Sequence, residues 1–333
     1  MFDQALHDKI KRKNKAIALI VSFLVLVFSV LRMFMTRFFV DPDIHFYIET
    51  TNIFVLSVDY IIAACVVLIY VISLFIYKRK LDNHNYAEVS DCFVQGTQTQ
   101  VFSASLTALL FIFAAGFQAY SFINPGNSLA EIQGLSVTER FIAYIQNYPF
   151  DFAIFFVSVF CAVYYFKTAA LNFDIGENIG QATVRAAEGE ETKEEKPAAK
   201  VKHKYSSAHV IFSFMPIIWA FLNVFKCFFD MSKSVNSPLR IYELISFLAL
   251  SAYFVSESRM LVERRELSKF FTFSYIAVIV TAVSALPNLI WSSFWMLQTN
   301  NGQIVYALEI SLAVYIFSRI YSQIRYGRFL LHR

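Results

Sequence analysis

Residues 16–35 read AIALIVSFLVLVFSVLRMFM, and this stretch decides the class of the fold. Arg32 is its only charged residue. A helix rises about 1.5 Å per residue, so about twenty apolar residues cross a hydrocarbon core of about 30 Å. The stretch is too long for a signal-peptide core, and the following TRFFVDPD lacks a small-residue cleavage pattern. We therefore expect it to be retained as a membrane-spanning helix.

The same pattern recurs along the 333-residue chain, which is 57% hydrophobic and only 16% charged. Soluble domains carry about 25% charged residues, so this composition excludes an ordinary cytosolic enzyme, and it also excludes a disordered chain. The sequence predicts an all-α polytopic integral membrane protein with about eight transmembrane helices. The seven further apolar stretches are residues 53–77, 101–123, 152–171, 210–229, 241–261, 271–291 and 304–321.

Lysine and arginine predict the orientation, because they favour cytoplasmic loops. With the N-terminus inside, 23 of the 29 basic residues fall on the cytoplasmic side. The sixth stretch has only residues 244–256 free of charge, but dropping it would place the C-terminal arginines outside. We therefore expect eight spans with both termini cytoplasmic, in a plasma membrane or a bacterial inner membrane.

Residues 186–204, AAEGEETKEEKPAAKVKHK, form a low-complexity run of mixed charges. Such a run cannot bury apolar surface, so it predicts a flexible cytoplasmic linker that a protein partner could bind. The linker divides the chain into an N-terminal four-helix membrane half, a charged segment and a C-terminal four-helix half. The predicted bounds are 1–171, 172–207 and 208–333.

Shorter signals predict local structure. The basic residues 1–15 are expected to lie flat on an anionic leaflet before the first span begins. Ser136 and Glu139 have the spacing of a capping box, which predicts a short interfacial helix. Pro216 and Pro287 interrupt the fifth and seventh spans, where proline frees a carbonyl group and often kinks the helix.

Charged residues inside the apolar stretches are the candidate site residues, because a charge at the bilayer centre costs about 2.5–3.5 kcal/mol. Arg32 and Asp59 lie near the outer ends of the first two spans, at depths within roughly 5 Å of each other. We expect them to pair, and we expect Lys226 and Glu243 to repeat the arrangement in the second half. Two interpretations stay open: a parallel repeat, as in some transporters, or pairs that merely pin helical hairpins.

Glu309 lies inside the eighth span without a nearby base in the sequence. It either shares a polar cavity with Asp59 or forms an interhelical hydrogen bond as a protonated acid. Glu257 and Arg259 are expected at a solvated cytoplasmic helix end with local ion pairs, not in a site.

The sequence contains no catalytic, phosphate-binding or dinucleotide-binding motif, and its six histidines show no metal-ligand spacing. It predicts no cofactor, no metal and, since the basic residues mark topology, no nucleic-acid partner. The lipid bilayer is the expected environment, and no oligomeric state is specified. The leading hypothesis is a non-enzymatic membrane component: a sensor, an assembly factor or a partner-binding subunit. The alternative is a small-solute or proton-coupled transporter that uses Asp59 and Glu309.

Overall fold

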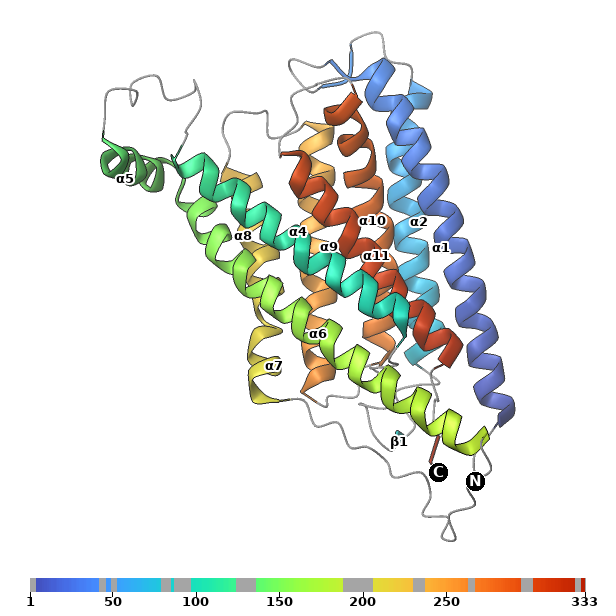
Figure 1. Cartoon of the computed structure of the whole chain (residues 1–333). Coiled ribbons are helices and arrows are strands. Elements are labelled where there is room, and N and C mark those ends of the chain that lie inside the picture. Colours follow the sequence, from blue (N-terminus) through green and yellow to red (C-terminus); the bar gives the residue numbers. More distant parts are fainter. Residues whose placement is uncertain are drawn as a thin grey trace.

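The fold is a bundle of long helices, seen here in a computed structural model (Figure 1). Eight helical segments are long and apolar enough to cross a membrane, which confirms the predicted all-α polytopic class. The structure describes residues 4–41, 46–48, 53–78, 85–86, 97–123, 136–187, 206–229, 237–262, 267–294, 302–326 and 331–332. The helices are α1 (Gln4–Phe39), α2 (Ile53–Lys78), α4 (Gln98–Ile123), α5 (Val137–Asn147), α6 (Pro149–Ala187), α7 (Ser207–Phe212), α8 (Met215–Phe229), α9 (Pro238–Leu261), α10 (Leu267–Phe294) and α11 (Gln303–Tyr326).

The only described strands are β1 (Asn85–Tyr86) and β2 (Leu331–His332), which pair antiparallel. Both chain ends lie at the same end of the bundle (Figure 1). An even number of spans requires this arrangement.

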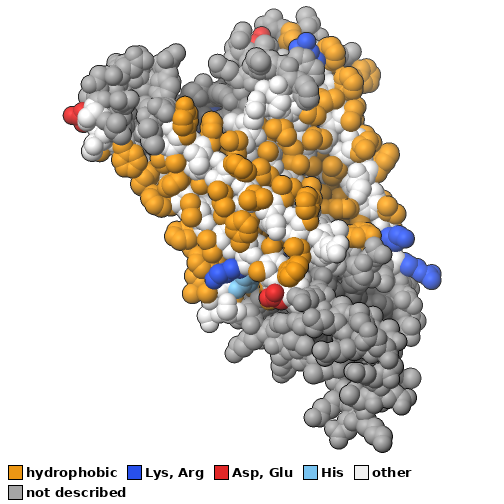
Figure 2. All heavy atoms as spheres, in the orientation of Figure 1, with side chains coloured by type: hydrophobic (Ala, Val, Ile, Leu, Met, Phe, Trp, Pro, Cys, Tyr) orange, Lys and Arg blue, Asp and Glu red, His pale blue; other side chains and the backbone are white. Residues whose placement is uncertain are grey.

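Helix α10 is central, because it packs against α1, α2, α9 and α11. Its span is the most buried of the eight described spans, whereas those of α1 and α2 are the least buried and the most apolar. Lipid cannot satisfy polar groups, so the helices that face it carry the most apolar sequences. On the face shown in Figure 2, hydrophobic side chains cover the middle of the bundle and visible charged side chains lie toward its ends.

The two predicted halves are interleaved in space. Helices α1 and α2 of the first half pack on α10, and α4 packs on α11. Ser103, Ala104 and Ala108 give α4 a buried face of small side chains, which lets neighbouring backbones approach closely. Ser103 Oγ lies 2.8 Å from Ser318 Oγ of α11. A single cluster of buried side chains therefore includes residues from both halves.

Two helices extend beyond the sequence-based boundaries. Helix α1 runs unbroken from Gln4 to Phe39, so no turn separates its basic start from its apolar span. Helix α6 continues to Ala187 and so includes residues 172–187, which were predicted to be linker. A hydropathy pattern marks where a helix leaves lipid, but the helix itself ends only where its hydrogen bonding ends. Residues 188–205 of the predicted linker lie outside the described part of the chain.

The fifth span is divided near its proline. Helix α7 ends at Phe212 and α8 begins at Met215, with Pro216 in its first turn. Proline has no N–H group, so a carbonyl one turn earlier loses its helical donor. At the break, the Ser213 carbonyl accepts a hydrogen bond of 2.9 Å from Ser258 Oγ on α9. Pro287, in contrast, lies inside the continuous helix α10.

The predicted capping box is confirmed at the start of α5. Glu139 Oε2 accepts hydrogen bonds of 2.8 Å from the backbone N–H and from Oγ of Ser136. These two donors hold the pKa of the exposed Glu139 carboxyl below its ordinary value of 4.5. This reciprocal bonding fixes the N-terminus of a helix that lies beside the end of the bundle (Figure 1).

Candidate functional site

The predicted pair on α1 and α2 lies in the part of the bundle away from the chain ends (Figure 1). Arg32 Nη1 lies 3.5 Å from Asp59 Oδ1, which confirms the expected pairing. The Arg32 side chain is 3% exposed and that of Asp59 is 25% exposed. The acid therefore lies nearer to the surface than the base that holds it.

This pair is also joined to α9. Tyr242 Oη donates a 2.8 Å hydrogen bond to Asp59 Oδ1, and the Arg32 guanidinium carbon lies 3.8 Å from the centre of the Tyr242 ring. Arg32 Nη2 donates to the Pro238 carbonyl at 3.2 Å. Tyr47, between α1 and α2, donates to Asp59 Oδ2. Burial raises the pKa of the Tyr47 hydroxyl well above its usual range, so it stays protonated and remains a donor.

Lys226 has a different partner from the one predicted. Its Nζ lies 2.7 Å from Asp151 Oδ1, so this ion pair joins α8 to the start of α6. Glu243 instead accepts a hydrogen bond from Tyr306 Oη of α11. The expected repeat of an acid–base pair between consecutive helices is therefore found at Arg32 and Asp59 but not at Lys226.

Helices α9 and α11 flank α10, and polar side chains connect them at two levels. At the level farther from the chain ends, which we call outer, Tyr306 donates to Glu243 and Ser246 Oγ donates to Glu309 Oε1 at 2.6 Å. Each contact joins α9 to α11. The two contacts lie next to each other, because Glu243 and Ser246 are one turn apart on α9 and Tyr306 and Glu309 are one turn apart on α11. We call these four residues the outer cluster.

Glu309 differs from the other charged residues of the candidate list. Its side chain is fully buried, and Oε2 has no hydrogen-bond partner among the described residues. Ser246 Oγ also lies 3.3 Å from Thr281 Oγ1 of α10. Glu309 and Asp59 thus have separate sets of hydrogen-bonding partners.

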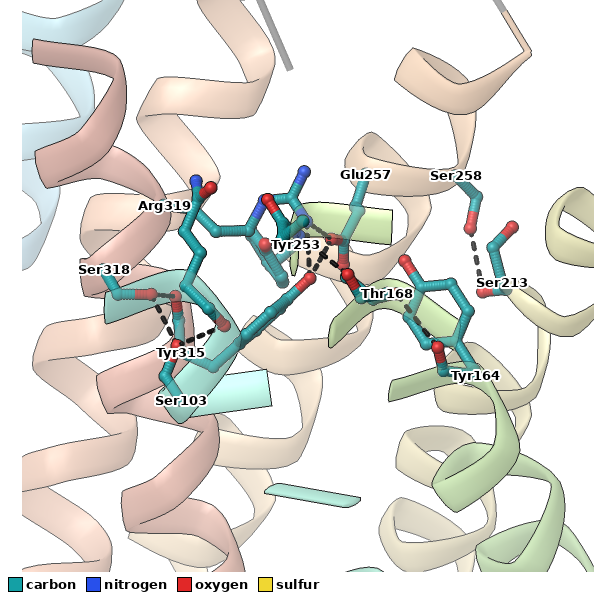
Figure 3. Close-up of polar contacts among 12 residues, drawn as sticks. Ser103, Tyr164, Thr168, Ser213, Tyr253, Glu257, Ser258, Tyr315, Ser318 and Arg319 are labelled. Atoms are coloured by element: carbon teal, nitrogen blue, oxygen red, sulfur yellow. Dashed lines mark hydrogen bonds and ion pairs between the residues drawn. The ribbon is translucent and has the colours of Figure 1, made fainter. Parts of the chain in front are cut away.

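At the level nearer to the chain ends, α9 and α11 are joined by Glu257, Tyr315 and Arg319, which we call the inner cluster (Figure 3). Arg319 Nη1 lies 3.2 Å from Glu257 Oε1. Tyr315 Oη donates to the same carboxylate oxygen at 2.8 Å and accepts from Arg319 Nη1 at 2.6 Å. The three side chains form a closed triangle in which the acid faces a base and a hydroxyl donor.

Buried tyrosines surround this triangle. Tyr253 of α9 and Tyr164 of α6 lie around the Glu257 carboxyl (Figure 3), and the Tyr165 ring centre lies 5.0 Å from that of Tyr315. Glu257 is 1% exposed, so its predicted place at a solvated helix end is wrong. Side chains of α6 and α11 cover it, and hydropathy along α9 alone cannot reveal them.

A sequence signal for the inner cluster does exist. Tyr253 and Glu257 are four residues apart on α9, and Tyr315 and Arg319 are four residues apart on α11. That spacing places each pair on one helical face. The two faces carry opposite charges, so the pattern is compatible with interhelical pairing, although it does not identify the partner helix.

Among the residues that the structure describes, no three His, Cys, Asp or Glu side chains are grouped to hold a metal ion. The described polar contacts join helices and neutralise charges, and the outer cluster adds a carboxyl with a buried, unsatisfied oxygen.

Comparison with known proteins adds no family. No protein-family model, no curated protein and no solved structure matches the chain.

Proposed function

We propose that this chain is a non-enzymatic membrane component that binds a protein partner at the end of the bundle where its termini lie. The observation that carries the proposal is the length of α6. Its apolar stretch is interrupted at Asp174, the first charged residue after Lys167, but the helix continues to Ala187 at that end of the bundle (Figure 1). Residues 175–187 add about three and a half turns, or about 20 Å, of helix beyond the lipid-facing part.

A helix that leaves the bilayer is not covered by lipid, so its surface can bind a protein. Here the helix leads into the charged residues 188–204. The excess of basic residues on one side supports a cytoplasmic position for this end in a plasma membrane or bacterial inner membrane. Together these features support a sensor, assembly or partner-binding subunit that recruits a cytoplasmic protein.

The intramembrane ion pairs support a scaffold role for the bundle. Each pair joins different helices, so each ties the bundle together while removing an isolated charge from the membrane. The pairs are Arg32–Asp59 between α1 and α2, Lys226–Asp151 between α8 and α6, and Arg319–Glu257 between α11 and α9.

Site-specific photo-crosslinking in cells tests the partner. A crosslinker at Gln181 on the α6 extension should capture one discrete protein, and a crosslinker at Tyr60, which is 77% exposed on α2, should not. Replacing residues 188–204 with a glycine–serine segment of equal length should abolish the adduct without changing the melting temperature. Equal adducts at both positions, or an adduct unaffected by the replacement, would contradict the proposal.

A transporter that uses Asp59 and Glu309 is the second candidate, and the unsatisfied Oε2 of Glu309 is the observation in its favour. Asp59→Asn or Glu309→Gln should then abolish a flux while expression and melting stay unchanged. Single cysteines at these two positions in a cysteine-free background should react with an impermeant maleimide added from outside. If neither reacts while a cysteine at Ser128 does, the acids are structural.

A further inference from the structure

Three fully buried side chains, one each from α9, α10 and α11, bring their oxygen atoms together. They belong to Glu309 of α11, Ser246 of α9 and Thr281 of α10, and each side chain is 0% exposed. Ser246 Oγ lies 2.6 Å from Glu309 Oε1 and 3.3 Å from Thr281 Oγ1. One hydroxyl hydrogen cannot serve both contacts, so Ser246 donates either to Glu309 or to Thr281, and its contact to Glu309 is the shorter one.

The second carboxyl oxygen of Glu309 is left over in either protonation state. If Glu309 is ionised, Oε2 is a buried anionic oxygen without a donor among the described residues. If Glu309 is protonated on Oε2, that O–H group has no described acceptor. An unsatisfied buried polar atom costs about 1–3 kcal/mol, and more when it is charged. Oε2 therefore keeps bonding capacity that the described side chains do not use.

We propose that Glu309, Ser246 and Thr281 bind a monovalent metal cation, with Na⁺ as its representative. Carboxylate and hydroxyl oxygens are ligands that hard cations prefer. One carboxylate balances one positive charge, so the bound cation removes the net charge from the membrane interior. Both hydroxyls can rotate and offer lone pairs to the cation, because the same group serves as donor and acceptor.

The neighbouring acid increases the attraction for a cation. Glu243 lies one turn from Ser246 on α9 and acts electrostatically on Glu309. Its carboxyl is held by Tyr306, so it contributes negative potential and not a described ligand. The inner cluster provides the contrast, because Arg319 already occupies the position beside Glu257 that a cation would take.

This inference deepens the second candidate function by naming its ion, but the site itself is defined by equilibrium binding. Binding of ²²Na⁺ is measured with the purified full-length protein in lipid nanodiscs, with choline chloride replacing sodium chloride at constant ionic strength. The wild-type protein should bind Na⁺ saturably, and its melting temperature should rise with Na⁺ but not with choline.

Matched variants assign the binding to these oxygens. Glu309→Gln keeps an acceptor for Ser246 but removes the charge, and it should weaken binding by about tenfold or more, equivalent to about 1.4 kcal/mol. Thr281→Val is nearly isosteric and should also weaken binding. The controls are Ser251→Ala on α9 and Thr272→Val on α10, whose hydroxyls bond within their own helices and should not affect it.

A wild-type protein that binds no Na⁺ overturns the site. Wild-type affinity for Na⁺ in both Glu309→Gln and Thr281→Val would also overturn the site. If Glu309→Gln fails to fold, the affinity of Thr281→Val alone decides whether these oxygens bind Na⁺. Binding without any flux confirms the site and rejects the transporter. The Gln181 crosslink and Na⁺ binding are independent measurements. A missing crosslink would therefore contradict the partner-binding proposal without affecting the Na⁺ site.

Discussion

Glu257 and Glu309 are both glutamates buried between α9 and α11, yet their surroundings differ. Glu257 Oε1 faces Arg319 Nη1 at 3.2 Å and Tyr315 Oη at 2.8 Å. Glu309 Oε1 faces the Ser246 hydroxyl at 2.6 Å, and its other oxygen has no described hydrogen-bond partner. One carboxyl is neutralised by the chain itself, and the other needs a proton or a cation from outside. Equal burial therefore does not mean an equal role.

The largest expected effect comes from breaking the inner ion pair. Arg319→Met leaves the Glu257 carboxylate buried without its base, and removing one partner of a buried pair costs about 3–5 kcal/mol. The free energy of unfolding, measured by denaturation in mixed micelles, should fall by that amount. Replacing both partners, as Glu257→Gln with Arg319→Met, should restore most of the loss. A double variant as unstable as the single one would show that packing matters more than charge.

Tyr315→Phe should have the next largest effect. The hydroxyl both donates to Glu257 and accepts from Arg319, and hydrogen bonds to charged groups contribute about 1.5–3 kcal/mol. The matched control is Tyr165→Phe, because Tyr165 packs against the Tyr315 ring but its hydroxyl has no described hydrogen-bond partner. The control should be neutral or stabilising in the same unfolding measurement. A similar loss in both variants would assign the effect to ring packing.

Glu309→Gln should change stability by less than about 1 kcal/mol in sodium-free buffer, because the amide oxygen still accepts from Ser246. The same substitution at Glu257 leaves Arg319 without its counter-charge and should cost several times more. Comparing the two melting curves tests the contrast between the clusters directly. Equal destabilisation would mean that Glu309 also has a charged partner.

The smallest effect is expected at Glu139, an exposed acid that serves as a reference. Because its pKa is lowered in the folded protein, its contribution to α5 is fully present above its unfolded value of 4.5. This contribution is lost as the pH falls through the lower folded value. Amide protection of α5 should therefore decrease as the pH falls below about 4.5. Ser136→Ala should remove most of this pH dependence, and an unchanged dependence would contradict the capping box.

Much of the fold could be predicted because the bilayer imposes simple requirements. All eight spans were predicted from apolar length, including the sixth, whose retention was argued from the basic residues that follow it. The errors concern helix ends outside the apolar stretches, where apolar length gives no signal. The continuation of α6 to Ala187 depends on backbone hydrogen bonds, which hydropathy does not describe.

The candidate site was only partly predictable. Depth along consecutive helices was sufficient to pair Arg32 with Asp59, because a short loop joins their helices. The same reasoning failed for Lys226, whose partner Asp151 comes from α6. It also placed Glu257 in solvent, because its covering side chains, Tyr164 and Tyr315, are distant in sequence.

The sequence by itself determined the membrane class and the number of spans, because both depend on transfer between water and lipid along each helix. The tertiary structure alone decided which helices lie side by side. Lateral neighbours depend on packing between segments far apart in the chain, and hydropathy says nothing about direction within the membrane plane. That difference is why Arg319 neutralises Glu257 while Glu309 is left with hydroxyl groups and an oxygen that has no described hydrogen-bond partner.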